Sequence, residues 1–274
     1  MIVPVEYEGL VRAALAEDAP YGDPFGAMFQ APGRALLLSR DVGVFCGGPV
    51  GVEVFRQLSP EVSVKFLAEG ATIGPDDVVG EIVGPLWALL RGERVALNFV
   101  QRLSGIATLT ARYVRIAAPH GVRILDTRKT TPLLRALEKY AVRTGGGVNH
   151  RNSLSDGVLI KENGIRAAGG IAAAVAAARK AVHHLCRVEV EVETLAEADE
   201  AVAAGADGLL LDNMSPENVR DAVARHGAHL FIEASGGITL DTLESYARTG
   251  IANIAIGALT HSAPAFDISF EVVA

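Results

Sequence analysis

Cationic side chains are concentrated at two places in the segment "ILDTRKTTPLLRALEKYAVRTGGGVNHR", residues 124–151. Arg128 and Lys129 directly follow a β-branched apolar run, and His150 and Arg151 follow three glycines about one helix later. Arg presents a planar fork that matches a carboxylate or a phosphate, whereas Lys is a mobile point charge. For Arg128 and Lys129 alone, a solvated loop is the competing interpretation. Both pairs together predict a pocket for ligands that carry several negative charges.

Charged residues also stand at the ends of other apolar runs. Asp126, Lys161, Glu191 and Asp212 each lie at or near the carboxyl end of a run that is otherwise apolar. Burial of an unpaired charge is costly, so these residues are poor candidates for core positions. In α/β barrels the active site lies at the carboxyl ends of the strands. The repeated placement therefore predicts a site there, and Arg94 in a helical segment supplies a further cation.

Acidic residues complement this cationic set. The carboxylates of Glu191 and Asp212 can accept hydrogen bonds from sugar hydroxyls, or hold Mg²⁺ directly or through water. In "VEVEVE", residues 188–193, glutamates alternate with valines and therefore share one face of a strand. If the valines pack outward against helices, the glutamates face the barrel interior. Only the glutamate nearest the carboxyl mouth is then expected to reach a ligand.

Glycines mark three turns that bear on function. "EASGGITL" (233–240) and "AIGALTHS" (255–262) each place small residues between a strand and a helix. Main-chain N–H groups and the helix dipole suit a phosphate at such a turn. Residues 145–147 are all glycine and follow an amphipathic helix, where a helix cap and a flexible turn explain at least one of them. Three together also allow the backbone to approach a ligand closely.

The second half of the chain supplies elements that can bring these residues together. From about residue 120 a short β-branched run, a charged residue, a turn and an Ala-rich amphipathic helix recur. Such alternation predicts parallel strands joined by crossover helices. So many units favour a closed or nearly closed barrel over a doubly wound sheet, which the spacing alone leaves open. The predicted strands are 122–126, 157–161, 187–193, 208–212, 230–237 and 251–257, and the predicted helices are 133–143, 170–182, 195–204, 215–226 and 240–249.

The first hundred residues lack this rhythm and predict a separate α+β domain. Near the end of the chain, apolar and polar residues alternate in "APAFDISFEVV". This segment can therefore add a strand to the N-terminal sheet. We therefore predict an N-terminal domain of residues 1–97 plus 265–274 and a barrel domain of residues 98–264. The expected elements are a helix near 6–18, extended chain over 33–48, a helix near 50–58, antiparallel-type alternation over 63–84 and a long helix over 87–118.

The composition narrows the class of protein. The chain has 274 residues, 50% of them hydrophobic and 21% charged, which supports a sizeable core. A formal net charge of −7 argues against nucleic-acid binding. Cys46 and Cys186 form no CxxC pair, so neither a disulfide framework nor a zinc site is predicted, and the cytoplasm is the natural setting. The N-terminus lacks signal-peptide order, and the Ala-rich stretch 167–178 is too short to span a bilayer, so no membrane partner is expected.

Several long segments, in order, closely resemble the quinolinate phosphoribosyltransferase family. The resemblance covers most of the chain from about residue 87, and extends more loosely to "AEDAPYGD" and "RDVGVFCGGPVGVEVF". The matching segments are "GERVALNFVQRLSGIAT", "ILDTRKTTPLLRALEKYAVRTGGGVNHR", "LIKEN", "VEVEVE", "LLLDNMSPE", "EASGGITL" and "GALTHSAPAFDIS".

The resemblance implies a fold, an assembly and a reaction. The fold is α/β, with an N-terminal α/β sandwich domain followed by an open or incomplete α/β (TIM-like) barrel. The assembly is a homodimer with shared sites, or a hexamer built from dimers. The reaction joins quinolinate and phosphoribosyl pyrophosphate with Mg²⁺ as cofactor, and yields nicotinate mononucleotide, pyrophosphate and CO₂ in de novo NAD synthesis.

The resemblance also implies roles for matching residues. Catalysis would fall to Lys129, Lys161, Glu191 and Asp212. Quinolinate would be surrounded by Arg128, His150, Arg151 and Lys161, with Lys129 nearby and Arg94 entering from the neighbouring subunit. Thr127 is a further substrate-binding residue. The ribose hydroxyls and the metal would meet Glu191 and Asp212, and the 5-phosphate would lie along Ser235, Gly236, Gly237, Gly257 and Ala258.

The chain departs from the family pattern in three places. Gly164 follows "LIKEN" where a histidine is usual, and "RNSLSDG" and "GDPFGAM" replace other common wordings. Two alternatives to the phosphoribosyltransferase therefore stay open at this point. One is a paralogue that acts on another pyridine carboxylate or serves molybdenum metabolism. The other is a catalytically weak or silent barrel that binds a phosphorylated metabolite or acts as a scaffold.

Overall fold

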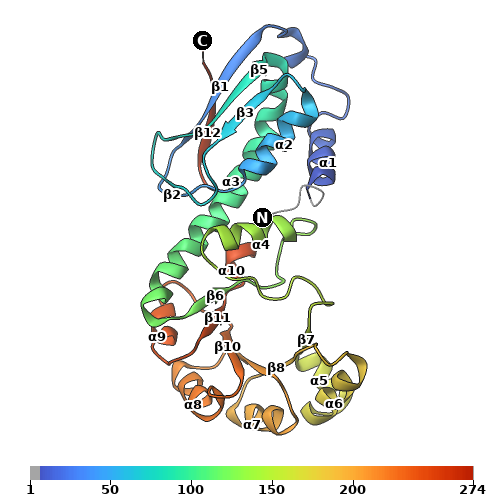
Figure 1. The fold of residues 1–274 in the computed structure, drawn as a ribbon, viewed down its shortest axis with the longest axis vertical. Helices are drawn as coiled ribbons and strands as arrows, with labels where there is room; N and C mark the ends of the chain where they lie inside the picture. The colour runs from blue at the N-terminus through green and yellow to red at the C-terminus, as the bar shows by residue number, and fades with distance from the viewer. Residues whose placement is uncertain (1–6, 274) are drawn as a thin grey trace. The chain divides into compact units, whose positions relative to one another are not determined.

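The second half of the chain forms a six-stranded parallel sheet, as Figure 1 shows. Each strand lies within a run predicted from the sequence, and successive strands pair with one another from β7 to β11. The strands are β6 (Arg123–Leu125), β7 (Val158–Ile160), β8 (Val188–Val192), β9 (Gly208–Asp212), β10 (Phe231–Ser235) and β11 (Asn253–Ala255). Their order across the sheet is β6-β11-β10-β9-β8-β7.

The sheet curves but does not close, which confirms the predicted open barrel. Strands β6 and β7 stand at its two ends and do not pair with each other. Next to β6 the described chain adds a single parallel bridge between Leu125 and Val148. The loop that carries His150 and Arg151 therefore follows this bridge, on the open side of the barrel.

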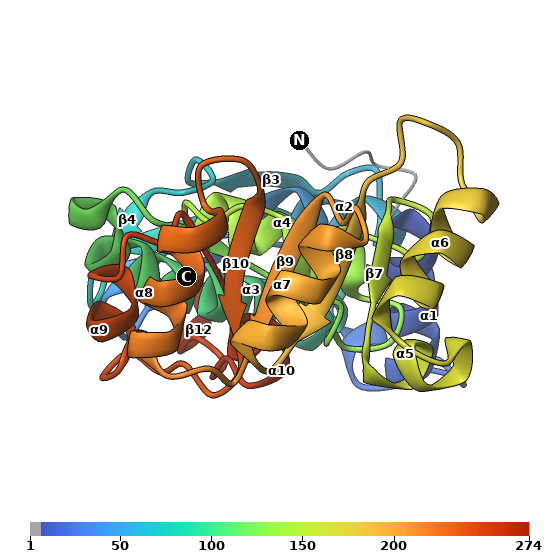
Figure 2. The same ribbon diagram turned by 90° about the horizontal axis from the view of Figure 1, so that it is seen from below.

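Helices cover the outer side of the curved sheet, as Figures 1 and 2 show. Residues 194–197 form a capping box at the start of α7, and Ser215 caps α8 ahead of Pro216, so both helices begin where their sequences predict. The short helix α5 was not predicted. The helices that follow β7 to β10 are α5 (Glu162–Ala168), α6 (Ile171–Ala181), α7 (Leu195–Ala203), α8 (Pro216–His226) and α9 (Leu243–Ala247).

The N-terminal part of the chain forms an antiparallel sheet of order β12-β1-β5-β3. Strand β12 (Ile268–Val273) pairs with β1 (Pro32–Ser39), which confirms that the closing alternation returns to this sheet. The other elements of this part are α1 (Glu8–Asp18), the 3₁₀ turn Gly26–Met28, β2 (Gly43–Val44), α2 (Gly48–Leu58), β3 (Ser63–Phe66), β4 (Thr72–Ile73) and β5 (Val78–Pro85).

A helix of 32 residues, α3 (Leu86–Ala117), matches the predicted long helical segment and leads through a 3₁₀ turn (Ala118–His120) into β6. The remaining helices are α4 (Arg135–Thr144), which follows β6, and α10 (Ala258–His261), which follows β11. No helix within the described residues is both long and apolar enough to cross a membrane.

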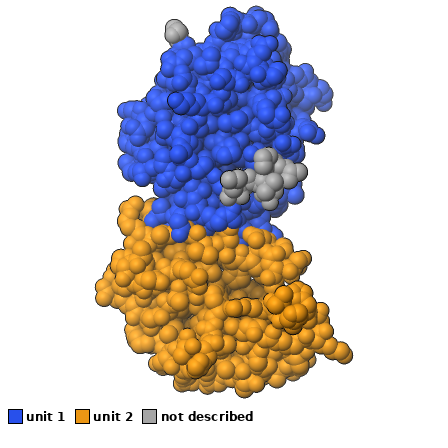
Figure 3. Space-filling model, in the orientation of Figure 1, with its two compact units in different colours: residues 1–111, 130–146, 258–274 blue, residues 112–129, 147–257 orange. Residues whose placement is uncertain are grey.

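The computed structural model describes residues 7–273, so the first residue of the predicted helix 6–18 lies outside the described residues. Two compact units divide the chain by internal contacts (Figure 3). Unit 1 contains residues 1–111, 130–146 and 258–274, and unit 2 contains residues 112–129 and 147–257. The domain boundaries at 97/98 and 264/265 stay a prediction.

Candidate active site

A cavity of about 240 Å³ opens at the carboxyl ends of the barrel strands, entirely within unit 2. Strands β7 to β11 and the loop after β6 each contribute lining residues, as expected when parallel strands direct their ends to one edge. The lining residues are Thr127, Arg128, Lys129, His150, Arg151, Leu159, Lys161, Glu191, Leu210, Asp212, Glu233, Ser235 and Ala255. Most of the residues predicted from the sequence therefore share one cavity.

The other predicted residues do not line this cavity. Gly236 and Gly237 follow β10 directly and adopt positive φ angles of 96° and 63°. Gly257 follows β11, and Ala258 is the first residue of α10. Arg94 lies on α3 in unit 1, with 59% of its side chain exposed and its Nη2 3.9 Å from Glu93 Oε1.

The guanidinium groups give the cavity an unsatisfied cationic character. Arg128 Nε is buried and has no hydrogen-bond acceptor among the described residues. Arg151 Nη1 donates to the carbonyl oxygen of Gly157 at 2.8 Å. Burial lowers the pKa of Arg151, and the nearby charge of Arg128 lowers it further. An anion between these groups would supply the missing acceptor and remove the repulsion.

Acidic groups balance part of this charge. Lys161 Nζ forms an ion pair with Glu191 Oε2. Asp212 ends β9, and its Oδ2 accepts a hydrogen bond from the side-chain amide of Asn213 at 2.8 Å. The structure thus places both predicted metal-binding carboxylates on the cavity wall. Carboxylate oxygens are the donors that Mg²⁺ prefers, so these residues fit the predicted ion.

The glutamates of β8 divide as the alternation predicts. Val188, Val190 and Val192 are buried, whereas the glutamates between them project to the barrel interior. Glu191 lines the cavity at the carboxyl ends. Glu189 lies one repeat lower and faces His150 instead. Glu193 is exposed beyond the end of the strand.

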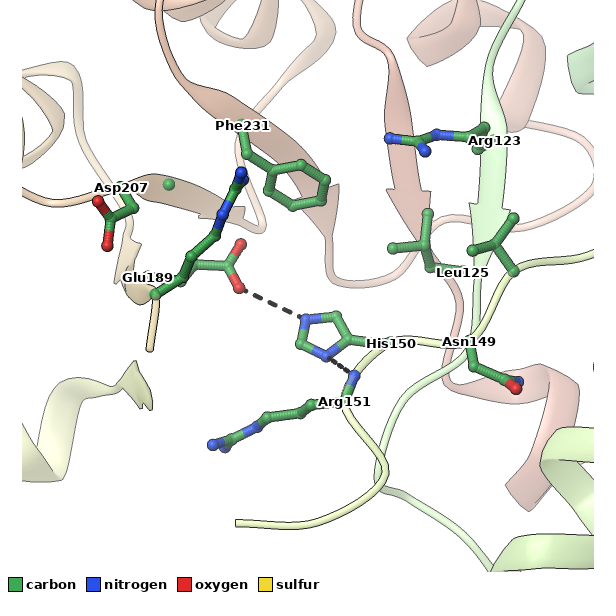
Figure 4. A pocket seen from close by; sticks show the side chains of 11 residues that line it. Arg123, Leu125, Asn149, His150, Arg151, Glu189, Asp207 and Phe231 are labelled. Atoms are coloured by element: carbon green, nitrogen blue, oxygen red, sulfur yellow. Dashed lines mark hydrogen bonds and ion pairs between the residues drawn. The ribbon is translucent and has the colours of Figure 1, made fainter. Parts of the chain in front are cut away.

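His150 is held at both ring nitrogens, as Figure 4 shows in part. The main-chain N–H of Arg151 donates to Nδ1 at 2.7 Å. Nε2 lies 3.2 Å from Glu233 Oε1 and 3.5 Å from Glu189 Oε2. Burial lowers the pKa of His150, and the two carboxylates raise it by more than burial lowers it. The direct binding of quinolinate by this ring stays a prediction.

Two buried acidic residues differ from the sequence prediction, since Asp126 was expected at the site and Glu233 was not identified. Asp126 is fully buried, and its Oδ1 accepts the main-chain N–H of His150 at 2.9 Å, so it fixes the loop rather than a ligand. Glu233 is also fully buried, and both its carboxylate oxygens lack a hydrogen bond among the described residues. The available signal was a glutamate within the otherwise apolar run "LFIEAS".

The chain that leaves Lys129 is anchored within unit 1 by a buried glutamate. Glu138 on α4 accepts the main-chain N–H of Thr131 at 3.0 Å and the hydroxyl of Thr131 at 2.7 Å. Arg102 Nη2 pairs with the same carboxylate at 2.8 Å. Because every oxygen of this carboxylate is used, the turn after Lys129 is closely fixed.

Two of the three glycines at 145–147 have structural roles, which supports the interpretation as a helix cap. A Cβ on Gly145 would lie 2.4 Å from the main-chain oxygen of Ala107, so only glycine fits against α3 at this position. Gly146 adopts a positive φ of 88°, which ends α4 without steric cost.

A second cavity, of about 300 Å³, opens at the amino ends of the same strands (Figure 4). Arg123, Arg187 and Phe231 line its outer part. His150 and Arg151 line both cavities, so the imidazole and its neighbours lie between them in the barrel interior.

Comparisons with known proteins agree with this architecture. Residues 25–104 match the family model described as quinolinate phosphoribosyl transferase, N-terminal domain. Residues 106–271 match the model for the C-terminal domain of the same family. Together the two matches cover nearly all of the chain.

Three similar proteins are each described as a nicotinate-nucleotide pyrophosphorylase. The chain is 42% identical over 281 residues to the nicotinate-nucleotide pyrophosphorylase [carboxylating] of Homo sapiens, which covers 100% of this chain and 94% of that protein. It is 40% identical to the Rattus norvegicus protein of the same description, over 100% of this chain and 93% of that protein. The solved nicotinate-nucleotide pyrophosphorylase of Francisella tularensis superposes with a TM-score of 0.95 at 38% identity, covering 100% of this chain and 98% of that one.

Proposed function

The chain belongs to the quinolinate phosphoribosyltransferase family, and from this premise we propose which of its residues carry out the reaction. The enzyme transfers a phosphoribosyl group from phosphoribosyl pyrophosphate to quinolinate with loss of CO₂, and so makes nicotinate mononucleotide for NAD biosynthesis. The alternative of a silent paralogue gains no support from these relatives.

We propose that quinolinate binds among Arg128, Arg151 and Lys161. The observation that carries this assignment is the unpartnered, buried Nε of Arg128 beside a second guanidinium in one cavity. Quinolinate brings two carboxylates, and a planar guanidinium can bind each with paired hydrogen bonds. Each charge-assisted bond contributes about 1.5–3 kcal/mol, so a few of them fix the orientation of the ring.

The phosphoribosyl donor is assigned to the acidic side of the cavity. Glu191 and Asp212 accept hydrogen bonds from the ribose hydroxyls, and the turn at Ser235, Gly236 and Gly237 offers main-chain N–H groups to the 5-phosphate. We assign Gly257 and Ala258 to a second phosphate-binding turn, as the sequence predicts. Mg²⁺, held by the same two acids, would neutralise charge on the pyrophosphate group.

The residues act mainly by positioning and by electrostatics. Arg128 and Arg151 hold the ring so that its nitrogen faces C1 of the ribose, which converts a bimolecular step into a local one. The new N–C bond forms as the C1–pyrophosphate bond breaks, and Lys129 and Lys161 stabilise the departing anion. The ring nitrogen is then cationic. It stabilises the electron pair left on C2 when the C2–carboxylate bond breaks to release CO₂, and a proton then adds to C2.

The assembly of the enzyme and its cellular compartment belong to the same proposal. Arg94, exposed on α3, is assigned to the site of the partner subunit in a homodimer. Both cysteines are free thiols in the structure, which suits a cytoplasmic enzyme.

The deciding experiment measures release of labelled CO₂ from carboxyl-labelled quinolinate in the presence of phosphoribosyl pyrophosphate and Mg²⁺. We expect CO₂ and nicotinate mononucleotide in equal amounts, and no mononucleotide from nicotinic acid. Faster turnover of nicotinic acid, or binding without turnover, would contradict the assignment.

A further inference from the structure

Glu233 is the least expected residue of the barrel interior. It lies on β10 between Ile232 and Ala234, is fully buried, and has no hydrogen bond to either carboxylate oxygen among the described residues. A buried carboxylate without a hydrogen bond is costly, so a protein that has one is expected to use it. Its nearest charged neighbour is the imidazole of His150, with Nε2 3.2 Å from Oε1.

Two glutamates face that imidazole. Glu189 reaches Nε2 from β8 and Glu233 reaches it from β10, with side-chain exposures of 14% and 0%. The His150 side chain is 13% exposed. Lys161 is the further charged group that acts on Glu233, from the end of β7. Both of these carboxylates face Nε2 of the imidazole.

The other side of the ring faces the chain that carries Arg151. The main-chain N–H of Arg151 donates to Nδ1 at 2.7 Å, and this bond requires the lone pair of Nδ1. The ring proton therefore sits on Nε2, which faces the carboxylates of Glu233 and Glu189 at 3.2 and 3.5 Å. A second ring proton, which the carboxylates favour, would have to share the gap with the N–H of Arg151. The Arg151 contact is the shortest of these three ring contacts, and it holds only while Nδ1 carries no proton.

This chain of contacts ends at a substrate-binding group. If the tautomer or the tilt of the ring changed, the acceptor for the Arg151 N–H would move. The guanidinium of Arg151, which lines the cavity at the carboxyl ends, would move with its main chain. A small displacement of a charged fork is enough to weaken a paired hydrogen bond.

We propose that Glu233 is a positioning residue for quinolinate: with Glu189 it fixes the Nε2–H tautomer of His150, and His150 Nδ1 in turn fixes the main chain of Arg151. The inference rests on the proposed function, because Arg151 is assigned there to quinolinate. Glu233 was not assigned to any substrate in the proposed function. In this inference His150 acts on quinolinate binding by holding Arg151.

The first test uses the isosteric variant Glu233→Gln, which removes a buried charge and keeps the side-chain volume. We expect quinolinate to bind about tenfold more weakly in a calorimetric titration. The KM for phosphoribosyl pyrophosphate is expected to stay unchanged. The matched control is Ile232→Val, which weakens the packing of the same strand on the other face of the sheet and should alter neither value. If Glu233→Gln weakens the binding of both substrates equally, or of neither, the proposal is wrong.

The second test asks whether Glu233 acts through His150. His150→Asn keeps an acceptor near the Nδ1 position and removes the Nε2 side. In that background Glu233→Gln should have no further effect on quinolinate binding, so the double-mutant cycle should show full coupling. Additive losses would overturn the proposal, because they mean that the glutamate acts independently.

A third measurement needs no substrate and separates this inference from the proposed function. In ¹⁵N-resolved NMR of the free enzyme, His150 should show the Nε2–H tautomer, and Glu233→Gln should disturb it. If wild type does not bind quinolinate, the proposed function fails whatever the spectrum shows. If wild type binds and the tautomer is unaffected by Glu233→Gln, only the positioning role fails.

One competing occupant is tested with the same protein. The ligand atoms of His150, Glu189 and Glu233 lie within 4.8 Å of one another, a spacing that also suits a divalent cation. Metal analysis of the purified enzyme should find no stoichiometric ion that disappears in Glu233→Gln. Such an ion would replace the ring proton and overturn the proposal.

Discussion

Arg151 is held in position by its main chain and by one nitrogen of its guanidinium group. Its main-chain N–H donates to His150 and its Nη1 donates to Gly157, so the rest of the guanidinium faces the cavity. The lowered pKa of Arg151 reflects burial and the nearby charge of Arg128. Two half-buried cations near each other are unfavourable unless an anion lies between them. The pocket is therefore organised for its ligand before the ligand binds.

Substitution of Arg151 should separate the contribution of charge from that of shape. Arg151→Ala is expected to weaken quinolinate binding about 100-fold, since it removes paired charge-assisted hydrogen bonds. Arg151→Lys keeps the charge but loses the planar fork, and should recover only part of the affinity. Calorimetric titration measures both values. Arg166→Ala on α5, which removes an exposed pair with Glu162, is the control and should bind as wild type does. An unchanged titration of Arg151→Ala would remove this residue from the site.

A second prediction at this scale concerns Gly236. A Cβ at this position would lie 2.3 Å from Asn213 Oδ1 and 2.8 Å from the main-chain nitrogen of Asn213, and φ is 96°. Gly236→Ala should therefore displace the turn and raise the KM for phosphoribosyl pyrophosphate by at least tenfold, because main-chain N–H groups no longer face the phosphate.

The control for Gly236→Ala is Gly205→Ala. Gly205 has a similar φ of 88° but no atom within 4 Å of the added Cβ. It should cost about 1 kcal/mol of unfolding free energy and leave both KM values unchanged. Steady-state kinetics and thermal unfolding of the two variants check the prediction. Equal effects from both would show that backbone strain, rather than the phosphate turn, is what matters at Gly236.

At the scale of elements, the barrel could be predicted because its strands are short, buried on both faces and separated by amphipathic helices. The run 208–212 is an example, since it is apolar throughout until Asp212. Charged residues at strand ends revealed the edge on which the site lies. Helix α5 was missed, because seven residues with Gly164 in their middle carry no clear period and no side-chain cap.

The interior of the site could not be predicted in the same way. Glu189 and Glu233 are on strands separated by β9, and only the register of the sheet places both beside one imidazole. Asp126 was expected near a ligand because it ends an apolar run. In the structure it accepts the main-chain N–H of His150 and so fixes that loop. A sequence shows which strand end carries a charge, but the partner across the barrel depends on three-dimensional packing.

Asp207 provides a prediction about the amino ends of the strands. Its Oδ2 accepts the main-chain N–H of Val188 and pairs with Arg179 Nη2, each at 2.7 Å. Burial raises the pKa of Asp207, but Arg179 and the Val188 N–H lower it by more. The stabilisation is therefore present above the unfolded-state pKa of about 3.9 and is lost as pH falls through the lower folded-state pKa.

Asp207→Asn should lower the free energy of unfolding by about 1 kcal/mol at neutral pH, a modest value because the ion pair is partly exposed and screened. The difference from wild type should shrink as the pH falls below about 4. Urea unfolding at several pH values measures it. Glu162→Gln, which removes an exposed pair with Arg166, is the control and should change stability by less than about 0.5 kcal/mol. A gap that persists undiminished in acid would contradict the linkage argument.

At the scale of the whole molecule, a chain with a formal charge of −7 places four lysine and arginine side chains on the wall of one cavity. Long-range attraction of anionic substrates is therefore weak, and recognition depends on short-range contacts inside the barrel mouth. The chain gathers Arg128, Lys129, Arg151 and Lys161 on the wall of that cavity. Arg94 is exposed on α3 and does not line it, which is consistent with a role in a second copy of the chain.

Mixing two inactive variants tests that shared site. Arg94→Ala and Lys161→Ala subunits each lack one residue assigned to a complete site, and each homodimer should be inactive. In a heterodimer one site carries both substitutions and the other carries neither. Equal mixtures refolded or co-expressed together should therefore recover about a quarter of wild-type activity, since half of the dimers are mixed and each has one intact site. The control mixes Lys161→Ala with Arg151→Ala, two residues of the same cavity, and should recover nothing. If mixed dimers are demonstrated by mass and the Arg94→Ala mixture stays as inactive as this control, Arg94 does not cross to the partner.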